Sequence, residues 1–210
     1  MTTELQAEFG RIDIYVFDQL LRGNLHDPQR LLDAGCGPGR NAHYLMRRGV
    51  DVFGVDKDPP QIARIRDRAS EIAPSLPGSN FRVAELDDLP FPDAHFGAVI
   101  CSAVLHFSRN ERHFEAIVAE LWRVLEPGGL YFARLASTIG LDGAATPIGD
   151  RWHALPDGSE RFLVDEAYLT KVSADLGATW VDPLKTTVVQ NMRAMTTWVL
   201  SLIHISEPTR

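Results

Sequence analysis

Residues 31–41 read LLDAGCGPGRN, and this stretch decides the fold. Two leucines and Asp33 have the pattern of a buried strand that ends at an acid, and three glycines follow on alternate positions, Gly35, Gly37 and Gly39. Glycine adopts positive φ without a steric penalty and leaves room for a ligand beside the backbone. We therefore expect a strand, a tight turn and a helix start around a binding site. The spacing is G-x-G-x-G, whereas the dinucleotide-binding G-x-G-x-x-G would need a glycine in place of Arg40.

Length and composition predict a globular protein of one domain with a large core, from 210 residues of which 45% are hydrophobic and 23% charged. The net charge of −7 argues against nucleic acid as a partner, because a phosphate backbone would select a basic face. No apolar run is long enough for a membrane span, and the start MTTELQAEFG has no signal-peptide pattern. We therefore expect a cytoplasmic protein without a membrane partner. The two cysteines, Cys36 and Cys101, cannot form a metal cluster alone, and no metal site is predicted.

Strand and helix patterns alternate through residues 4–135. Apolar runs predict strands over 30–33, 50–56, 81–85, 96–101 and 130–135. Apolar residues recur at helical spacing over 4–22, 40–48, 59–72 and 110–125. Such alternation favours an α/β fold, in which a parallel sheet is covered by helices on both faces.

The pattern changes after this core. Residues 137–164 carry Gly, Pro and Asp with little periodicity, so we expect a long excursion that acts as a lid or borders the substrate. A helix is expected over 165–176, and two further strands over 179–190 and 192–202.

The chain is expected to divide into parts of one domain. Residues 1–29 would form an N-terminal helical cap, 30–136 a ligand-binding core, and 165–199 a C-terminal helix with a strand hairpin. The last residues, LSLIHISEPTR at 200–210, resemble a translated sequencing adapter. We therefore expect the native sequence to differ from about residue 200 onward.

Acidic side chains follow the predicted strands at positions where a nucleotide-type ligand would meet them. Asp56 ends the second strand, about twenty residues beyond the glycines, where a carboxylate can accept both ribose hydroxyls. Glu85, Asp87 and Asp88 follow the third strand and could meet an adenine edge, although Asp87 and Asp88 also fit exposed loop acids. Open α/β sheets bind ligands at the carboxyl ends of their strands, so these positions belong to one predicted site.

Residues 31–135 resemble a class I S-adenosylmethionine-dependent methyltransferase. The matching segments are LLDAGCGPGRN, VFGVDKD, VAELDDLPFPDAHFGAVICSAVLHF and LWRVLEPGGLYFARL. The resemblance implies a Rossmann-like, mostly parallel sheet of seven strands with an antiparallel last strand. It also implies S-adenosyl-L-methionine as cofactor. GRN after the glycines and a lysine after the ribose acid are similar to tellurite-resistance and related small-molecule methyltransferases.

The resemblance assigns roles to individual residues. The glycines would pass under the methionine part of the cofactor, Asp33 would orient the loop, and Asp56 would hold the ribose with Lys57 beside it. Glu85 stands where the family has an aspartate for the adenine amino group. The cofactor-binding residues implied in this way are Asp33, Gly35, Cys36, Gly37, Gly39, Asn41, Asp56, Lys57, Glu85, Leu86, Cys101 and Ser102.

Several side chains have two interpretations. Cys36 also fits a small packing residue, because nothing near it in sequence suggests an activated thiolate. His106 follows the fourth strand and is either a catalytic base of the acceptor pocket or a structural histidine. Tyr15 fits the core stripe of its helix or a lid over the cofactor. Further pocket candidates are Arg134, Trp152 and His153.

Methyl transfer to a small-molecule acceptor is the predicted function, since the chain carries no added domain for a macromolecular substrate. Two alternatives stay open at this point. One is a non-catalytic S-adenosylmethionine-binding protein, which keeps the glycine loop without a productive acceptor pocket. The other is a nicotinamide-dependent oxidoreductase, which shares the sheet and the ribose acid.

Overall fold

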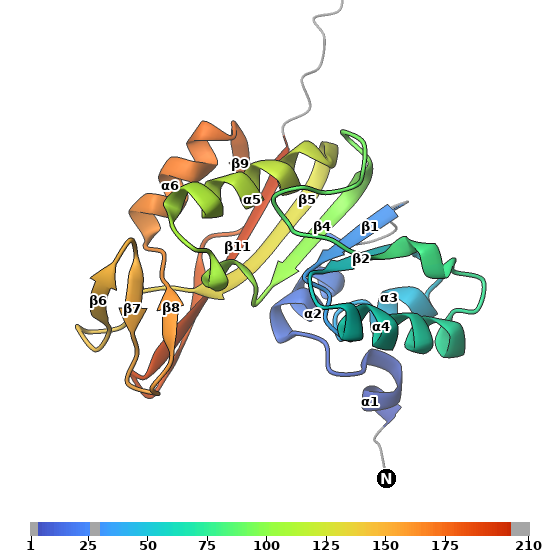
Figure 1. Ribbon diagram of the computed structural model, residues 1–210, viewed down its shortest axis with the longest axis horizontal. Coiled ribbons are helices and arrows are strands. Elements are labelled where there is room, and N and C mark those ends of the chain that lie inside the picture. The colour runs from blue at the N-terminus through green and yellow to red at the C-terminus, as the bar shows by residue number, and fades with distance from the viewer. Residues whose placement is uncertain (1–3, 26–29, 203–210) are drawn as a thin grey trace, which may run out of the picture.

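The structure, a computed structural model, describes residues 4–25 and 30–202 (Figure 1). Within these residues a central sheet has the strand order β10-β11-β5-β4-β1-β2-β3, and a short strand, β9, pairs with the end of β11. The strands are β1 (Arg30–Ala34), β2 (Asp51–Asp56), β3 (Phe81–Val83), β4 (Phe96–Ser102), β5 (Leu125–Ala136), β9 (Ala178–Trp180), β10 (Lys185–Val189) and β11 (Arg193–Leu202).

Strands β1 to β5 are parallel to one another, and β11 is antiparallel to both β5 and β10. This topology confirms the predicted Rossmann-like sheet with an antiparallel last strand. Parallel strands present their carboxyl ends at one edge of a sheet. The loops after β1, β2 and β4 therefore meet at that edge.

Helices cover both faces of the sheet, as expected. Alternate residues of a strand point to opposite faces: Leu32 packs with α5 and α6, whereas Leu31 packs with α2, α3 and α4. The helices are α1 (Glu4–Phe9), α2 (Ile14–Leu21), α3 (His43–Arg47), α4 (Pro59–Ile72), α5 (Glu111–Arg123) and α6 (Glu166–Asp175).

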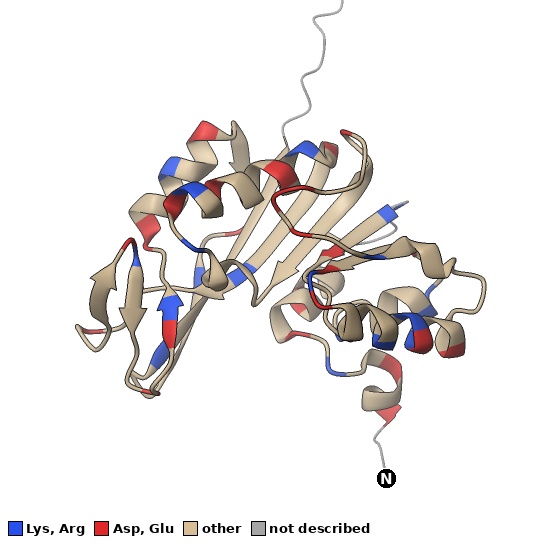
Figure 2. Ribbon diagram, in the orientation of Figure 1, with Lys and Arg blue, Asp and Glu red and all other residues tan. Residues whose placement is uncertain are grey.

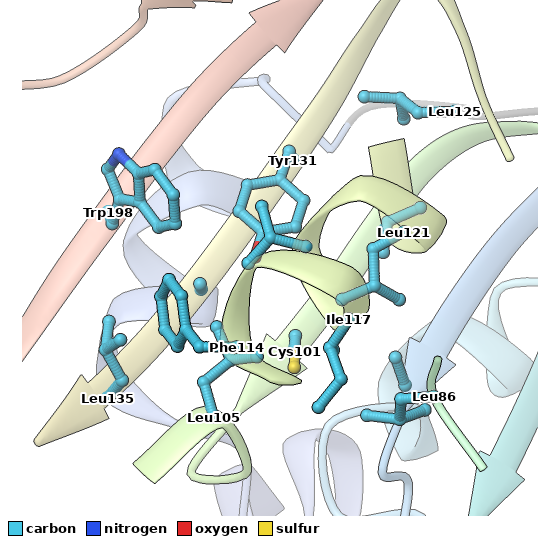
Figure 3. Packing of buried hydrophobic residues seen from close by; sticks show 14 of the residues in the cluster. Leu86, Cys101, Leu105, Phe114, Ile117, Leu121, Leu125, Tyr131, Leu135 and Trp198 are labelled. Atoms are coloured by element: carbon cyan, nitrogen blue, oxygen red, sulfur yellow. The ribbon is translucent and has the colours of Figure 1, made fainter. Parts of the chain in front are cut away.

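Helix α5 shows why the sequence folds this way locally. Asn110 caps it by accepting a hydrogen bond from the His113 N–H (2.9 Å), and its apolar stripe includes Phe114 and Leu121. Figure 3 shows this stripe lying over Tyr131 and Cys101 of the sheet. Burying each of these large side chains contributes about 2 kcal/mol.

Four local predictions need correction. The helix expected over 4–22 is two helices, because the chain turns at Gly10 (φ +65°) and Asp13 caps a new helix. The strand expected over 179–190 is two strands, β9 and β10. The helix expected over 40–48 is shorter and consists of α3 alone, His43–Arg47. The strand expected over 130–135 begins earlier, at Leu125, because β5 runs through the Pro-Gly-Gly segment.

The excursion over 137–164 has more regular structure than its composition predicted. It contains a three-stranded antiparallel sheet of β6 (Thr146–Gly149), β7 (Trp152–Ala154) and β8 (Glu160–Phe162). This small sheet lies at the β5–β11 side of the molecule (Figure 1). It borders one of the two cavities described below.

The C-terminal strand includes part of the segment that resembles an adapter. Leu200 is fully buried and pairs with Tyr131 and Trp180, so residues up to Leu202 complete β11. Residues 203–210 lie outside the described residues, and the expected departure from the native sequence stays a prediction. Among the described residues, no helix is both long and apolar enough to cross a membrane.

Candidate active site

A cavity of about 790 Å³ lies at the carboxyl ends of β1, β2 and β4. Its walls come from the glycine loop, the ends of those strands, the segment after β3, and the start of α5. The residues that line it are Gly35, Cys36, Gly37, Pro38, Arg40, Asn41, Asp56, Lys57, Ala84, Glu85, Leu86, Ser102, Ala103, Val104, Phe107, Ser108, His113 and Ile117.

The glycine loop is tied to β2 by backbone bonds and by one carboxylate. The N–H groups of Gly35 and Cys36 donate to the Val55 carbonyl (2.8 and 2.9 Å). The Gly37 N–H donates to Asp56 Oδ2 (2.9 Å), and the Asp58 N–H donates to Asp56 Oδ1 (3.0 Å). A carboxylate has about four acceptor positions. Asp56 therefore shapes the loop and retains acceptor capacity for a ligand's hydroxyl groups.

The glycines of the loop differ in what surrounds them. A Cβ on Gly35 (φ +71°) would lie 2.4 Å from Val104 Cγ2, and one on Gly39 (φ +79°) would lie 2.8 Å from Ile65 Cδ1. A Cβ on Gly37 (φ +50°) would meet no atom within 4 Å. Gly35 and Gly39 are thus required by packing within the protein. Gly37 instead keeps a space open at the cavity wall.

Asp33 is a buried acid at the end of β1, immediately before the loop. It is 2% exposed, and its Oδ2 has no hydrogen-bond partner among the described residues. Burial raises the pKa of Asp33 to about 7, Arg40 opposes the rise, and Asp56 adds to it. An unpartnered buried carboxylate oxygen is unfavourable unless a cation or a donor reaches it.

Nine of the predicted cofactor residues lie on the wall of this cavity: Gly35, Cys36, Gly37, Asn41, Asp56, Lys57, Glu85, Leu86 and Ser102. Asp33, Gly39 and Cys101 do not. Cys101 is fully buried among apolar side chains beneath α5 (Figure 3). Burial raises the pKa of both cysteine thiols well above the usual range, so both stay protonated and neither acts as a nucleophile.

A second cavity of about 400 Å³ adjoins the first, and the two share Arg40 and Ala103 as walls. Ala103 has a left-handed backbone (φ +64°), which is unusual for a residue other than glycine and is typical of functional sites. The remaining wall residues are His106, Arg134, Ala136, Leu155, Asp157, Ser159, Arg161, Thr187, Val189, Arg193 and Met195.

His106, the predicted base, lies on the second cavity. It is 7% exposed, and its Nδ1 has no partner among the described residues. Burial, together with the charge of Arg161, lowers the pKa of His106 to about 4. The imidazole is therefore neutral at pH 7 and keeps a lone pair that can accept a proton.

Asp13 joins the N-terminal helices to the walls of both cavities. Its Oδ2 accepts hydrogen bonds from Arg134 Nη1 (2.7 Å) and Ser102 Oγ (3.3 Å), and Arg40 Nη2 lies 3.6 Å away. Its own N–H donates to Asn41 Oδ1 (3.0 Å). An acid before a helical stripe is a recognisable N-cap signal. No sequence pattern indicates that Asp13 pairs with Arg134, which lies 121 residues further along the chain.

The other candidates lie in different places. The Tyr15 hydroxyl is 2.7 Å from Thr187 Oγ1, and its ring packs beneath Arg134 and against the core, so its position fits the core interpretation. Tyr15 lines neither cavity. Trp152 Nε1 donates to the Arg109 carbonyl (3.1 Å), and His153 Nδ1 lies 2.8 Å from the Arg151 carbonyl. Neither Trp152 nor His153 lines either cavity.

His113 is a wall residue that the sequence did not single out. Its Nδ1 accepts from the Arg109 N–H (3.0 Å), and its Nε2 is 3.4 Å from Asp87. Asp87 also pairs with the Arg109 side chain (3.4 Å), which makes it a structural acid at the cavity rim. The sequence indicated a helix with an apolar stripe at this point, and His113 is not part of that stripe. Only the structure shows that His113, in the first turn of α5, lines the first cavity.

Comparison with known proteins decides the family. Residues 32–133 match the sequence profile described as "Methyltransferase domain". The chain is also 31% identical over 171 residues to "Demethylmenaquinone methyltransferase" of Thermus thermophilus, which covers 70% of this chain and 73% of that protein. The chain belongs to the class I S-adenosylmethionine-dependent methyltransferases. The nicotinamide alternative is not supported.

The chain is similar to other members of this family over shorter stretches. It is 37% identical over 102 residues to "Uncharacterized methyltransferase YodH" of Bacillus subtilis, covering 49% of this chain and 41% of YodH. The chain spans about half the length of the first curated relatives that it matches. The crystal structure of Burkholderia thailandensis 1,6-didemethyltoxoflavin-N1-methyltransferase has the same fold, with a TM-score of 0.67, 19% identity, and coverage of 95% of this chain and 81% of that one.

S-adenosyl-L-methionine is the cofactor of this family, and the residues of the first cavity fit it. The open space at Gly37 suits a chain that passes over the loop, and the unpartnered Asp33 carboxylate, which is buried just before the loop and is not part of the wall, supplies a negative charge that suits a nearby ammonium group. Asp56 and Glu85 offer acceptors for hydroxyl and amino groups. Leu86, Val104 and Ile117 supply the apolar surface that an adenine ring requires.

Proposed function

We propose that this methyltransferase transfers a methyl group from S-adenosyl-L-methionine to a small-molecule acceptor held in the second cavity. The observation that carries the proposal is the shared wall of the two cavities at Arg40 and Ala103. Reactants in adjoining cavities can be aligned for direct transfer, which is the main contribution of a protein to such a reaction. A cytoplasmic location stays a prediction.

The chain's own residues divide the work between binding and alignment. When bound, the cofactor supplies an electrophilic methyl group. The glycine loop, Asp33 and Asp56 would hold its polar groups, while Asp13 fixes Arg40, Arg134 and Ser102 between the N-terminal helices and the sheet. His106 would accept a proton from an acceptor that must lose one.

Gly37 provides the direct test of cofactor binding. In Gly37→Ala, the new methyl group enters only open space, so the folded protein loses about 1 kcal/mol from the left-handed backbone. A ligand that uses this space would clash with the methyl group. We expect the affinity for S-adenosylhomocysteine, measured by titration calorimetry, to fall by at least about tenfold.

Gly177 is the matched control for this experiment. It also has positive φ (+62°) with no atom within 4 Å of an added Cβ, and it follows α6, away from both cavities. Gly177→Ala should lose a similar amount of stability while it binds S-adenosylhomocysteine as wild type does. Equal affinity in the two variants, or binding of NADH in place of S-adenosylhomocysteine, would refute the proposed cofactor site.

His106 tests the transfer step. With an acceptor that must lose a proton, His106→Ala is expected to lower kcat by about a hundredfold or more, because a positioned base contributes roughly that factor. Its affinity for S-adenosylhomocysteine should stay within about twofold of wild type, since His106 lies on the second cavity only. Steady-state kinetics combined with calorimetry separates the two effects. Unchanged turnover would remove His106 from the mechanism.

The pH profile gives an independent check on His106. The base is active in its neutral form, and burial and the charge of Arg161 together lower the pKa of His106 to about 4. The rate contributed by this base should therefore stay constant as the pH falls from 8 to about 5, and then decrease. A profile that falls with a midpoint near 6.5 would contradict a buried neutral His106. A protein that binds S-adenosylhomocysteine but methylates none of a panel of thiols, amines and hydroxylated aromatics would favour the non-catalytic alternative.

A further inference from the structure

The second cavity is rich in positive charge although the chain as a whole carries a net charge of −7. Its wall contains four arginines, Arg40, Arg134, Arg161 and Arg193, and one acid, Asp157. Figure 2 shows basic residues on β5, β8 and β11 around this region. A concentration of one charge that opposes the charge of the whole protein is a feature of sites that attract the opposite charge.

Two of the four arginines have a structural role that accounts for them. Arg134 forms an ion pair with buried Asp13 at 2.7 Å, and Arg40 lies 3.6 Å from the same carboxylate. Asp13 therefore compensates the charge on the side of the cavity that adjoins the cofactor site. These contacts tie the N-terminal helices to the sheet.

The other two arginines have no carboxylate within ion-pair distance among the described residues. Arg161 Nη1 donates only to the Glu160 carbonyl (2.6 Å), and its guanidinium lies 5.0 Å from the Phe107 ring centroid. Arg193, at the start of β11, has no side-chain hydrogen bond to any described residue. Asp157 accepts from Ser159 (2.6 Å), which lowers the pKa of Asp157, and the charges of Arg193 and Arg161, which line the same cavity, lower it further.

The rest of the cavity wall is apolar or uncharged. Leu155 and Met195 belong to a small hydrophobic cluster, and Ala136 and Val189 lie beside them on the wall. A ligand of this cavity would thus place a carbon skeleton against these side chains. Arg161 is half-buried and Arg193 is exposed, and a guanidinium group forms stronger hydrogen bonds to an anion than to a neutral group, so an anionic group on the ligand would be stabilised at these two arginines.

We propose that the acceptor is an organic anion, a carboxylate or a phosphate ester, whose anionic group is bound by Arg161 and Arg193. This inference rests on the proposed function, because it names the class of acceptor for the same second cavity. Arg161 and Arg193 come from the small β6-β7-β8 sheet and from the β10–β11 hairpin. The excursion over 137–164 would therefore contribute to acceptor specificity through Arg161.

The test measures anion binding without requiring that the natural acceptor be known. The full chain is saturated with S-adenosylhomocysteine, and benzoate, phenyl phosphate and the neutral analogue benzamide are titrated by ligand-observed NMR. We expect one or both anions to bind at least about tenfold more tightly than benzamide, since hydrogen bonds to charged groups are the stronger ones. The ratio of the two anion affinities distinguishes a carboxylate site from a phosphate site.

Variants assign the effect to the two arginines. Arg161→Gln and Arg193→Gln should each weaken the preferred anion by at least about tenfold. Arg193 is exposed at a strand end, so its variant should fold even if Arg161→Gln does not. Arg64→Gln, at an exposed position on α4 outside both cavities, is the matched control and should bind as wild type does. Unfolding curves verify that each variant is folded.

The outcomes separate this inference from the proposed function. Equal affinity for benzamide and the anions, no anion binding by wild type, or wild-type anion affinity in the Arg193 variant would each overturn the inference. Binding of S-adenosylhomocysteine is measured in the same samples. If the wild type binds S-adenosylhomocysteine and methylates neutral acceptors as well as their anionic counterparts, the proposed function stands and the anionic acceptor is rejected. If it does not bind S-adenosylhomocysteine, the proposed function fails whatever the anion data show.

Discussion

Asp13→Ala is expected to lower the free energy of unfolding by roughly 3–5 kcal/mol, because it leaves the largely buried Arg134 side chain without its counter-charge. The Asp13 side chain is 1% exposed and that of Arg134 19%, so water replaces little of the lost interaction. The variant also removes the N-cap of α2, which adds about 1 kcal/mol. Chemical denaturation monitored by circular dichroism measures the loss.

Two further variants separate the causes. Asp13→Asn retains an oxygen that can accept from the Tyr15 N–H, so it should preserve the cap and lose only the charge pairing. Asp18 lies on α2, where its side chain is 33% exposed, and it pairs with Arg22 and with Lys185 of β10. Asp18→Asn breaks these ion pairs and should change stability by about 1 kcal/mol or less. If Asp13→Ala proves no more harmful than Asp18→Asn, Asp13 does not hold the N-terminal helices in place.

Asp33→Asn is expected to stabilise the ligand-free protein at pH 8 and to weaken cofactor binding. The pKa of this carboxyl is about 7 in the folded chain against a model-peptide value of 3.8, because burial disfavours the charged form. Between pH 4 and 7 the folded chain holds a proton that the unfolded chain has lost. The free energy of unfolding therefore decreases as the pH rises through this window, by on the order of 4 kcal/mol in total.

The measurement compares unfolding of wild type and Asp33→Asn at pH 5 and at pH 8. The asparagine does not titrate, so its advantage over wild type should be small at pH 5 and largest at pH 8. Asp67→Asn, at an exposed acid on α4, should show no such pH dependence. A stability difference that is the same at both pH values would contradict a protonated Asp33.

The affinity of wild type for the cofactor should increase as the pH rises, whereas its stability decreases. A cationic group that binds to this carboxylate favours its ionised form, so wild type should bind S-adenosylhomocysteine more tightly at pH 8 than at pH 6. Asp33→Asn should bind at least about tenfold more weakly at pH 8, with little change between the two pH values. Calorimetric titration at pH 6 and 8 tests both statements. Wild-type affinity in the asparagine variant would exclude contact between Asp33 and the cofactor.

Most of the wall of the first cavity was predictable because its signals are local. Three alternate glycines need positive φ, and an acid at the end of β2 follows at a regular distance, so residues 31–41 and Asp56 identify the site within a short stretch of chain. The parallel sheet covered by helices also followed from the repeating strand-and-helix pattern, whereas the order of its strands came only from the structure. The helix expected over 4–22 was wrong in its interior, because Gly10 ends α1 and Asp13 caps α2 within an otherwise regular spacing of apolar residues.

By itself, the sequence determined the fold class, the glycine loop and the edge of the sheet at which the first cavity lies, because each depends on residues close together in the chain. Only the tertiary structure decided which side chains meet at the acceptor side. It brought Asp13 to Arg134, and Arg161 to the same cavity as Arg193, across separations that no spacing rule covers. It also left Asp33 unpartnered and Gly37 beside open space. Long-range packing sets burial and charge compensation, and these two properties decide what a cavity can bind.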